Sequence, residues 1–180
     1  MNEEWQTLKS QEIHRNPWYR LMQDEVLMPS GQVGKYTYID RPAGVIILAF
    51  DNEQKLYLVG QYRYPAKKFS WEVPMGTIEK SDADILAAAK RELREEVGLE
   101  AATWSEVGTF FYANGVSNQL GHVYLAEDIE QKESMPDYTE FLSMKKVTVA
   151  ELEALIDSGE ITDAPTIAAY YKFKLYRGRS

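Results

Sequence analysis

The chain has 180 residues, of which 44% are hydrophobic and 27% are charged, with no cysteine and a formal net charge of -8. This composition is ordinary for a soluble globular protein, and it excludes a disulfide scaffold, thiol catalysis and a cysteine-ligated zinc site. The negative charge argues against a nucleic-acid binder. Without an apolar run of ~18 residues or a secretory signal, we expect a cytoplasmic protein with no membrane partner.

The first predicted elements form a hairpin. Residues 18–28 and 35–40 are expected to be strands, joined by a turn at the sequence Pro-Ser-Gly. We therefore expect residues 1–42 to be an N-terminal hairpin and residues 43–180 to be the main domain.

The main domain is predicted to alternate strands with one long helix. The continuous apolar run at residues 45–50 indicates a buried strand. Further strands are expected at 55–61, 69–73, 103–112, 122–127 and 140–146, and C-terminal helices at 147–159 and 163–176. This order predicts an α+β fold, an α/β/α sandwich in which a mixed sheet lies between helices.

The long helix has clear sequence signals. Ser81 or Asp82 can cap its start, Asp84 would lie in the first turn, and Gly98 suits a left-handed stop. One apolar stripe is expected on this helix. Its members are Ile85, Leu86, Ala89, Leu93 and Val97.

Three carboxylates, Glu92, Glu95 and Glu96, project away from that stripe together with Arg91. Glu92 and Glu96 are one turn apart, a rise of roughly 6 Å, so both can reach one ion or a pair of ions. The simpler interpretation is a solvated charged face with Arg91–Glu95 pairing. The order of residue types favours the metal site. Oxygen ligands without cysteine suggest Mg²⁺ or Mn²⁺, which would also offset the repulsion between these carboxylates and a diphosphate.

Residues 91–99 read Arg-Glu-Leu-Arg-Glu-Glu-Val-Gly-Leu, with Gly76 fifteen residues before Arg91. This stretch resembles the second half of the signature of the Nudix hydrolases. The first half departs from the usual pattern, because it is one residue longer and Asp82 stands closest to the position of the usual glutamate. The resemblance implies the Nudix fold and hydrolysis of a phosphoanhydride bond.

Flanking segments resemble the branch that contains ADP-ribose pyrophosphatases and nucleoside diphosphate sugar hydrolases acting on GDP-mannose. They include Gln-Tyr-Arg-Tyr-Pro at residues 61–65, Trp-Glu-Val-Pro-Met-Gly at 71–76 and Tyr-Thr-Glu-Phe-Leu at 138–142. For this branch the resemblance implies that the backbone carbonyl of Met75 completes a metal site formed by Glu92, Glu95 and Glu96. It also implies that Glu140 is the general base, with Glu95 as the second candidate; the simpler interpretation of Glu140 is an exposed loop carboxylate.

The hypothesis gives several other residues a role. Gly76 would let its loop approach the ion and the diphosphate closely, and Arg91 would orient the glutamates by bidentate hydrogen bonding. Arg63 is a candidate ligand for phosphate or ribose, although a surface arginine is an equal alternative. Substrate contacts are also expected from Glu72, Trp18, Tyr19 and Ser117; the loop around Ser117 carries amides where related sequences often have an acidic residue.

Members of this branch commonly exchange their N-terminal sheets in a homodimer, so the resemblance implies a homodimer here. Two other functions stay open. The chain can be a nucleotide-sugar sensor on a Nudix fold, or a Nudix hydrolase of dinucleoside polyphosphates or nucleoside triphosphates. All of the signature carboxylates and Arg91 are present, which favours an enzyme acting on a nucleoside diphosphate sugar.

Overall fold

The computed structural model describes residues 4–131 and 143–178, which form two compact units. The first unit consists of the described residues up to Pro42 together with Phe111–Leu120. The second unit consists of Ala43–Phe110 together with the described residues from Gly121 onward. In the part of the chain described, no helix is both long enough and apolar enough to span a membrane.

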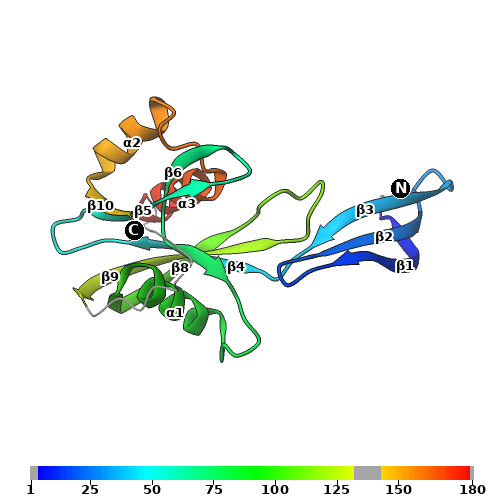
Figure 1. Ribbon diagram of the computed structural model, residues 1–180, viewed down its shortest axis with the longest axis horizontal. Helices are drawn as coiled ribbons and strands as arrows, with labels where there is room; N and C mark the ends of the chain where they lie inside the picture. The colour runs from blue at the N-terminus through cyan, green and yellow to red at the C-terminus, as the bar shows by residue number, and fades with distance from the viewer. Residues whose placement is uncertain (1–3, 132–142, 179–180) are drawn as a thin grey trace. The chain divides into compact units, whose positions relative to one another are not determined.

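The first unit is built on a three-stranded antiparallel sheet in the order β1-β2-β3 (Figure 1). These strands are β1 (Gln6–Arg15), β2 (Arg20–Leu27) and β3 (Val33–Asp40). The predicted hairpin is observed as β2 and β3, and β1 is a further strand that the sequence did not predict. All ten residues of β1 are exposed, so this strand has no buried apolar face that would have marked it in the sequence.

The segment Phe111–Leu120 pairs with the end of β3 in the first unit. Ile39 forms a bridge with Ser117, and its N–H donates to the carbonyl of Val116 at 2.8 Å. The Asn118 side chain accepts the Arg41 N–H at 3.0 Å and donates to Asp40. These bonds fix the loop around Ser117 to this sheet.

The second unit contains two sheets. A four-stranded sheet in the order β7-β4-β9-β8 includes the parallel pair of β4 with β9, so it is mixed. Its strands are β7 (Met75–Thr77), β4 (Gly44–Ala49), β9 (Leu120–Gln131) and β8 (Leu99–Phe111). A three-stranded antiparallel sheet in the order β10-β5-β6 is formed by β10 (Ser143–Val147), β5 (Leu56–Arg63) and β6 (Lys68–Glu72).

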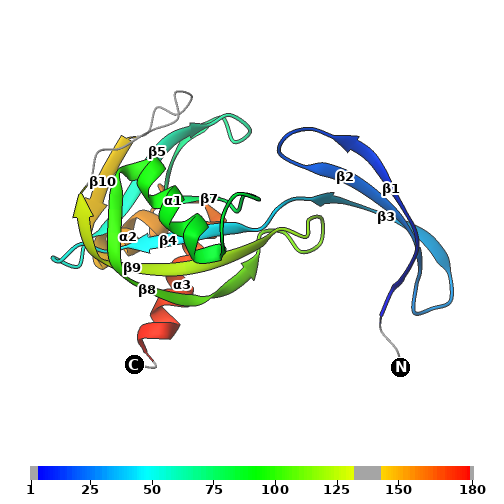
Figure 2. The same cartoon turned by 90° about the horizontal axis from the view of Figure 1, so that it is seen from below.

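Three helices cover the strands of the second unit. They are α1 (Ile85–Val97), α2 (Val149–Asp157) and α3 (Ala164–Arg177). In Figures 1 and 2, α1 lies on one side of β4, and α2 and α3 lie on the other. Every residue of β4 is buried, as the apolar run predicted. The predicted α/β/α arrangement with a mixed sheet is confirmed.

The start of α1 differs from the prediction, whereas its end agrees. Asp84, not Ser81 or Asp82, is the N-cap, and its Oδ1 accepts the Ala87 N–H at 2.7 Å. Asp82 is unavailable as a cap because its carboxylate accepts hydrogen bonds from the Glu79 N–H and from Arg91. Gly98 ends the helix in the left-handed conformation with φ 65°, as expected.

Other boundaries differ as well, and two of these differences lie near the site or its expected base. β7 was expected to be loop, because a strand of three residues is too short to show an alternating pattern. The strand predicted at 140–146 is observed as β10, from Ser143 to Val147; residues 140–142, including Glu140, lie outside the described residues.

Candidate active site

The candidate site begins where β7 meets α1. β7 pairs with β4 through Gly76 and Val45, and the Met75 N–H donates to Glu96 Oε2 at 3.0 Å. A Cβ atom on Gly76 would lie 2.0 Å from Cδ of Glu92 and 2.2 Å from each of its carboxylate oxygens. Glycine at this position therefore leaves the space that the Glu92 carboxylate occupies against β7, and a larger residue would displace that carboxylate.

Arg91 links this helix to the preceding loop. Its Nε donates to Asp82 Oδ1 at 3.0 Å, and its second terminal nitrogen donates to Asp82 Oδ2 at 3.2 Å and to the Thr77 carbonyl at 2.9 Å. Its first terminal nitrogen donates to Glu92 and to Glu95, both at 2.9 Å. The bidentate partner is thus Asp82, whereas Glu92 and Glu95 each receive one bond from the guanidinium.

The charged groups of this cluster shift one another's pKa values. Burial raises the pKa of the Glu92 carboxyl above its ordinary value, and the neighbouring Arg91 opposes that effect. The hydrogen bond from Arg91 lowers the pKa of Asp82, and the bond to Asp82 raises the pKa of the Arg91 guanidinium. Glu92 therefore stands out as a desolvated carboxylate that additional positive charge would stabilise.

The residues fit a divalent cation. Glu92 and Glu96 both border the backbone at Met75–Gly76, and carboxylate and carbonyl oxygens are the ligands that Mg²⁺ and Mn²⁺ prefer. Within residues 4–131 and 143–178, no three acidic or histidine side chains already converge as a metal site. Glu95 is instead held on Arg91 and is half exposed.

A second acidic residue, Glu72, is buried at the end of β6 with 2% of its surface exposed. Arg63 at the end of β5 donates to both of its carboxylate oxygens, through Nε at 2.9 and 3.2 Å and through a terminal nitrogen. The next residue, Val73, donates its N–H to Thr166 Oγ1 of α3 at 3.1 Å. Glu72 thus holds the guanidinium of Arg63, which is itself partly exposed, in one orientation.

Three further predicted residues, Trp18, Tyr19 and Ser117, lie in the first unit, whereas Glu140 is outside the described residues. Trp18 and Tyr19 form the turn between β1 and β2, where both backbone N–H groups donate to Asn16 Oδ1 at 2.9 Å. Trp18 is 70% exposed. Ser117 lines a cavity of about 400 Å³ together with Tyr36, Tyr38 and Phe111.

The structure therefore brings together Met75, Gly76, Arg91, Glu92, Glu95 and Glu96 around α1, and pairs Arg63 with Glu72. The sequence did not assign Asp82 or the Thr77 carbonyl to this cluster. Asp82 carried a signal, because it was already identified as the acidic residue nearest to the missing glutamate of the motif. The Thr77 carbonyl carried none, because a backbone group has no residue-type signature.

Comparison with known proteins agrees with this geometry. The model of the NUDIX domain matches residues 40–170, and that of the nucleoside diphosphate sugar hydrolase N-terminal domain matches residues 5–39. The methanol dehydrogenase activator of Bacillus methanolicus is 32% identical over 174 residues, which are 96% of this chain and 94% of that protein. The ADP-ribose pyrophosphatase of Bacillus subtilis (strain 168) is 30% identical over 175 residues, which are 96% of this chain and 94% of that protein.

A solved ADP compounds hydrolase shares the fold, with a TM-score of 0.86, 19% sequence identity, and coverage of 98% of this chain and 96% of its own. The family match covers most of the chain and includes the whole cluster around α1. The resemblance read from residues 91–99 is confirmed, and the chain belongs to the Nudix hydrolases.

Proposed function

We propose that the chain hydrolyses the diphosphate of nucleoside diphosphate sugars, with ADP-ribose as the first candidate and GDP-mannose as the second. Water attacks one phosphorus, the bond from that phosphorus to the bridging oxygen breaks, and a nucleoside monophosphate and a sugar phosphate are released. The similarity to an ADP-ribose pyrophosphatase over nearly the full length supports this substrate class. The lack of cysteine and the net charge of -8 support a cytoplasmic protein that does not bind nucleic acid.

One observation carries the proposal: Gly76 leaves room for Glu92 directly against the β7 backbone, beside Glu96. Glu92, Glu96 and the Met75 carbonyl would hold Mg²⁺ or Mn²⁺, with Glu95 as a further ligand once it leaves Arg91. The chemistry that such a cation supplies when bound is neutralisation of the diphosphate and acidification of water.

The chain's own residues then have distinct tasks. Arg91 fixes Glu92 and Glu95 from its anchor on Asp82. Arg63, oriented by Glu72, binds a phosphate or ribose oxygen of the substrate. Glu140 accepts the proton of the attacking water, with Glu95 as the alternative acceptor, and Ser117, Trp18 and Tyr19 contact the substrate. The structure describes no contacts of Glu140, so this assignment stays a prediction from the sequence.

The decisive test is phosphate release in a phosphatase-coupled assay with ADP-ribose, GDP-mannose, UDP-glucose and ATP, each with Mg²⁺ or with chelator. We expect metal-dependent cleavage of one or two diphosphate sugars and a loss on the order of 10³-fold in Glu96→Gln. Glu160→Gln, which removes an equivalent charge at an exposed position, serves as the control. Cleavage of ATP alone would assign the chain to a different Nudix class, and normal turnover by Glu96→Gln would overturn the metal site.

We also propose a homodimer formed through the first unit. β1 is an edge strand whose residues are all exposed, including the apolar side chains of Leu8 and Ile13. A long edge strand with exposed apolar side chains is the kind of surface that a second copy covers. Sedimentation of the protein at twice the 20.7 kDa of one chain would support the dimer, and a monomer at all concentrations would refute it.

A second candidate function follows from the 32% identical relative, which is named as an activator of methanol dehydrogenase. Nicotinamide dinucleotides contain the same adenosine diphosphate linked to ribose, so a hydrolase of ADP-ribose can act on them. Adding this protein to a methanol dehydrogenase with NAD⁺ tests the idea. A rise in dehydrogenase rate that Glu96→Gln abolishes would favour an activator, whereas tight nucleotide-sugar binding without any cleavage would favour a sensor.

A further inference from the structure

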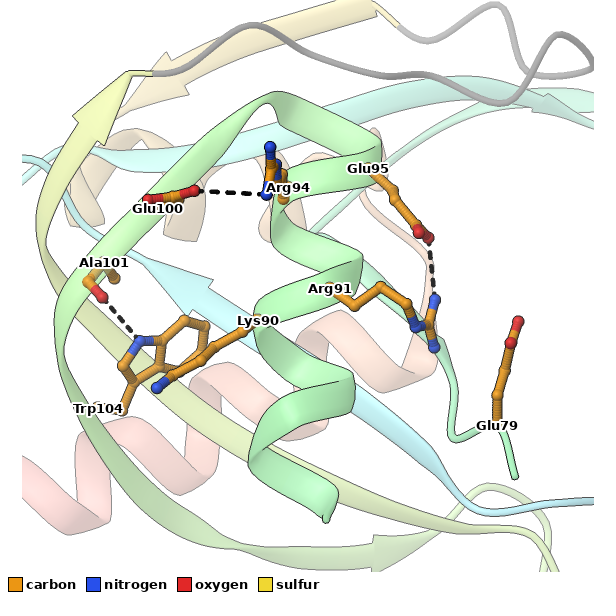
Figure 3. Close-up of a pocket in the computed structure, with 8 residues that line it drawn as sticks. All are labelled: Glu79, Lys90, Arg91, Arg94, Glu95, Glu100, Ala101 and Trp104. Carbon is orange, nitrogen blue, oxygen red and sulfur yellow. Dashed lines mark hydrogen bonds and ion pairs between the residues drawn. The ribbon is translucent and has the colours of Figure 1, made fainter. Parts of the chain in front are cut away.

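The outer face of α1 borders a cavity of about 890 Å³. One end of this cavity, here called the basic end, is lined by Lys90 and Arg94, and the proposed reaction does not use it. Figure 3 shows Lys90 and Arg94 projecting from successive turns of α1, with Trp104 of β8 beside Lys90 and Glu100 beside Arg94. Lys90 and Arg94 are each two positions along the chain from Glu92 or Glu96, and two positions correspond to a rotation of about 200° around the helix. The basic end of this cavity is therefore on a different face of α1 from the two carboxylates that lie against β7.

One acidic residue, Glu100, lines this end of the cavity together with the two cations. No residue in the described part of the chain forms an ion pair with Lys90. Arg94 has one acidic neighbour, Glu100, at 3.8 Å, and both of these side chains are about half exposed. A contact of that length between exposed groups contributes little, so both cations are available to an anion.

The indole of Trp104 is held in place in the same cavity, beside Lys90. Its Nε1–H donates to the Ala101 carbonyl at 3.0 Å, and its ring packs edge-on against Tyr124 with centroids 6.2 Å apart. The residue is only partly buried and lines the cavity. A fixed, partly exposed indole can stack on a planar ring of a ligand at little cost in conformational entropy.

We propose that this cavity binds a nucleoside monophosphate, with Lys90 and Arg94 on the phosphate and Trp104 on the base. A phosphate monoester carries a charge of about -1.5 to -2 at pH 7, which matches two cations. The cavity volume lies in the range of roughly 300–1,000 Å³ typical of small-molecule sites and greatly exceeds that of a bare phosphate. This inference goes beyond the proposed reaction and does not require that the chain cleave ADP-ribose.

The opposite end of the same cavity is lined by Glu79, Arg91 and Glu95. Figure 3 shows Arg91 and Glu95 joined there by their hydrogen bond. A monophosphate at the basic end would therefore lie in one cavity with Arg91, the residue that holds Glu92 and Glu95.

The test is calorimetric titration with AMP, adenosine and inorganic phosphate in the presence of chelator, which keeps divalent cations away from the carboxylates. We expect wild-type protein to bind AMP more tightly than either fragment. Lys90→Gln/Arg94→Gln should bind AMP at least about tenfold more weakly, because two charge-assisted hydrogen bonds are lost. Lys9→Gln/Lys172→Gln, which removes two positive charges that do not line the cavity, should bind as wild type.

Three results would overturn the site: no AMP binding by wild-type protein, equal binding by Lys90→Gln/Arg94→Gln and wild type, or equal affinity for phosphate and AMP. Trp104→Leu provides a second measurement for the base. It should weaken AMP binding while leaving phosphate binding unchanged, and equal AMP binding by Trp104→Leu would exclude stacking. Since no arm measures hydrolysis, failure of this inference is distinct from failure of the proposed activity.

Discussion

The two units stabilise their strands in opposite ways. Every residue of β4 in the second unit is buried, whereas every residue of β1 in the first unit is exposed. Burial of apolar side chains contributes most of the free energy of folding, so the second unit has its own core. Among the described residues β1 pairs only with β2, and its exposed apolar side chains are available for another chain.

The largest expected effect is on the core of the second unit. Leu93 on α1 is fully buried in the main cluster of apolar residues. Leu93→Ala should lower the free energy of unfolding by about 2–5 kcal/mol, because the substitution leaves a cavity. Leu8→Ala in β1 should change it by less than about 0.5 kcal/mol. Urea denaturation of both variants measures the contrast, and equal losses would contradict it.

The next effect concerns the close contact at Gly76. Gly76→Ala places a methyl group within 2.2 Å of the Glu92 carboxylate, so the carboxylate must move. A displacement of this size should lower turnover by about 10²-fold. Gly115→Ala in the first unit is the matched control, since no atom lies within 4 Å of its added Cβ. If both variants keep full activity, the position of Glu92 is not critical.

A smaller effect is expected at the exposed strand. Leu8→Glu and Ile13→Glu place charges on β1, where both side chains are about half exposed. Each should weaken self-association while changing the unfolding free energy of the monomer by less than about 0.5 kcal/mol. Thr7→Glu and Gln11→Glu add the same charge at polar positions of β1 and should have less effect. Sedimentation velocity at several concentrations distinguishes these outcomes.

The smallest expected effect is the pH-dependent contribution of Asp51 to the stability of the second unit. Asp51 follows β4, and its carboxylate accepts the backbone N–H of Glu53 and Lys55 and the Lys146 ammonium, each at 2.9 Å. Burial alone would raise the pKa of Asp51, but these bonds bring the net pKa below its ordinary 3.8. The stabilisation is therefore complete above pH 3.8 and is lost as pH falls through the lowered value.

Asp51→Asn should cost about 1 kcal/mol at neutral pH, since the amide keeps the two backbone contacts and loses the ionic one. The difference from wild type should shrink steadily below pH 3.8. Asp40→Asn in the first unit is the comparison, because hydrogen bonds from Asn118 and Arg20 also lower the pKa of Asp40. Thermal unfolding as a function of pH is the measurement. A stability difference between Asp51→Asn and wild type that stays constant at every acidic pH would contradict the assignment.

The sequence was informative wherever a pattern repeats. The apolar stripe predicted the burial of Ala89, Leu93 and Val97 on α1, and Gly98 predicted the end of the helix. Ile85 and Leu86 are only partly buried, and the buried Ala88 was not predicted. The apolar run of β4 predicted a strand buried on both faces. These features depend on residues close together in the chain, which local physical rules describe well.

The sequence was less informative where a structure depends on distant or backbone groups. β1 is exposed throughout and therefore lacks a periodic signal, and β7 is too short to show one. Asp82 could be identified as an acidic residue near the helix. That its carboxylate binds Arg91 and does not cap the helix depends on the path of the loop. The roles of the site residues, the division into domains at residue 42 and the dimer stay predictions.

The Arg91 guanidinium described above also limits how this part of the protein can be re-engineered. It contacts Asp82 and the Thr77 carbonyl on the loop side, and Glu92 and Glu95 on the helix side. A loop grafted between Thr77 and Asp84 without an acidic residue at the place of Asp82 would keep the helix sequence yet remove the side-chain anchor of its arginine. Successful transplants must therefore exchange the loop and the helix as one block, or retain an acidic residue at the place of Asp82.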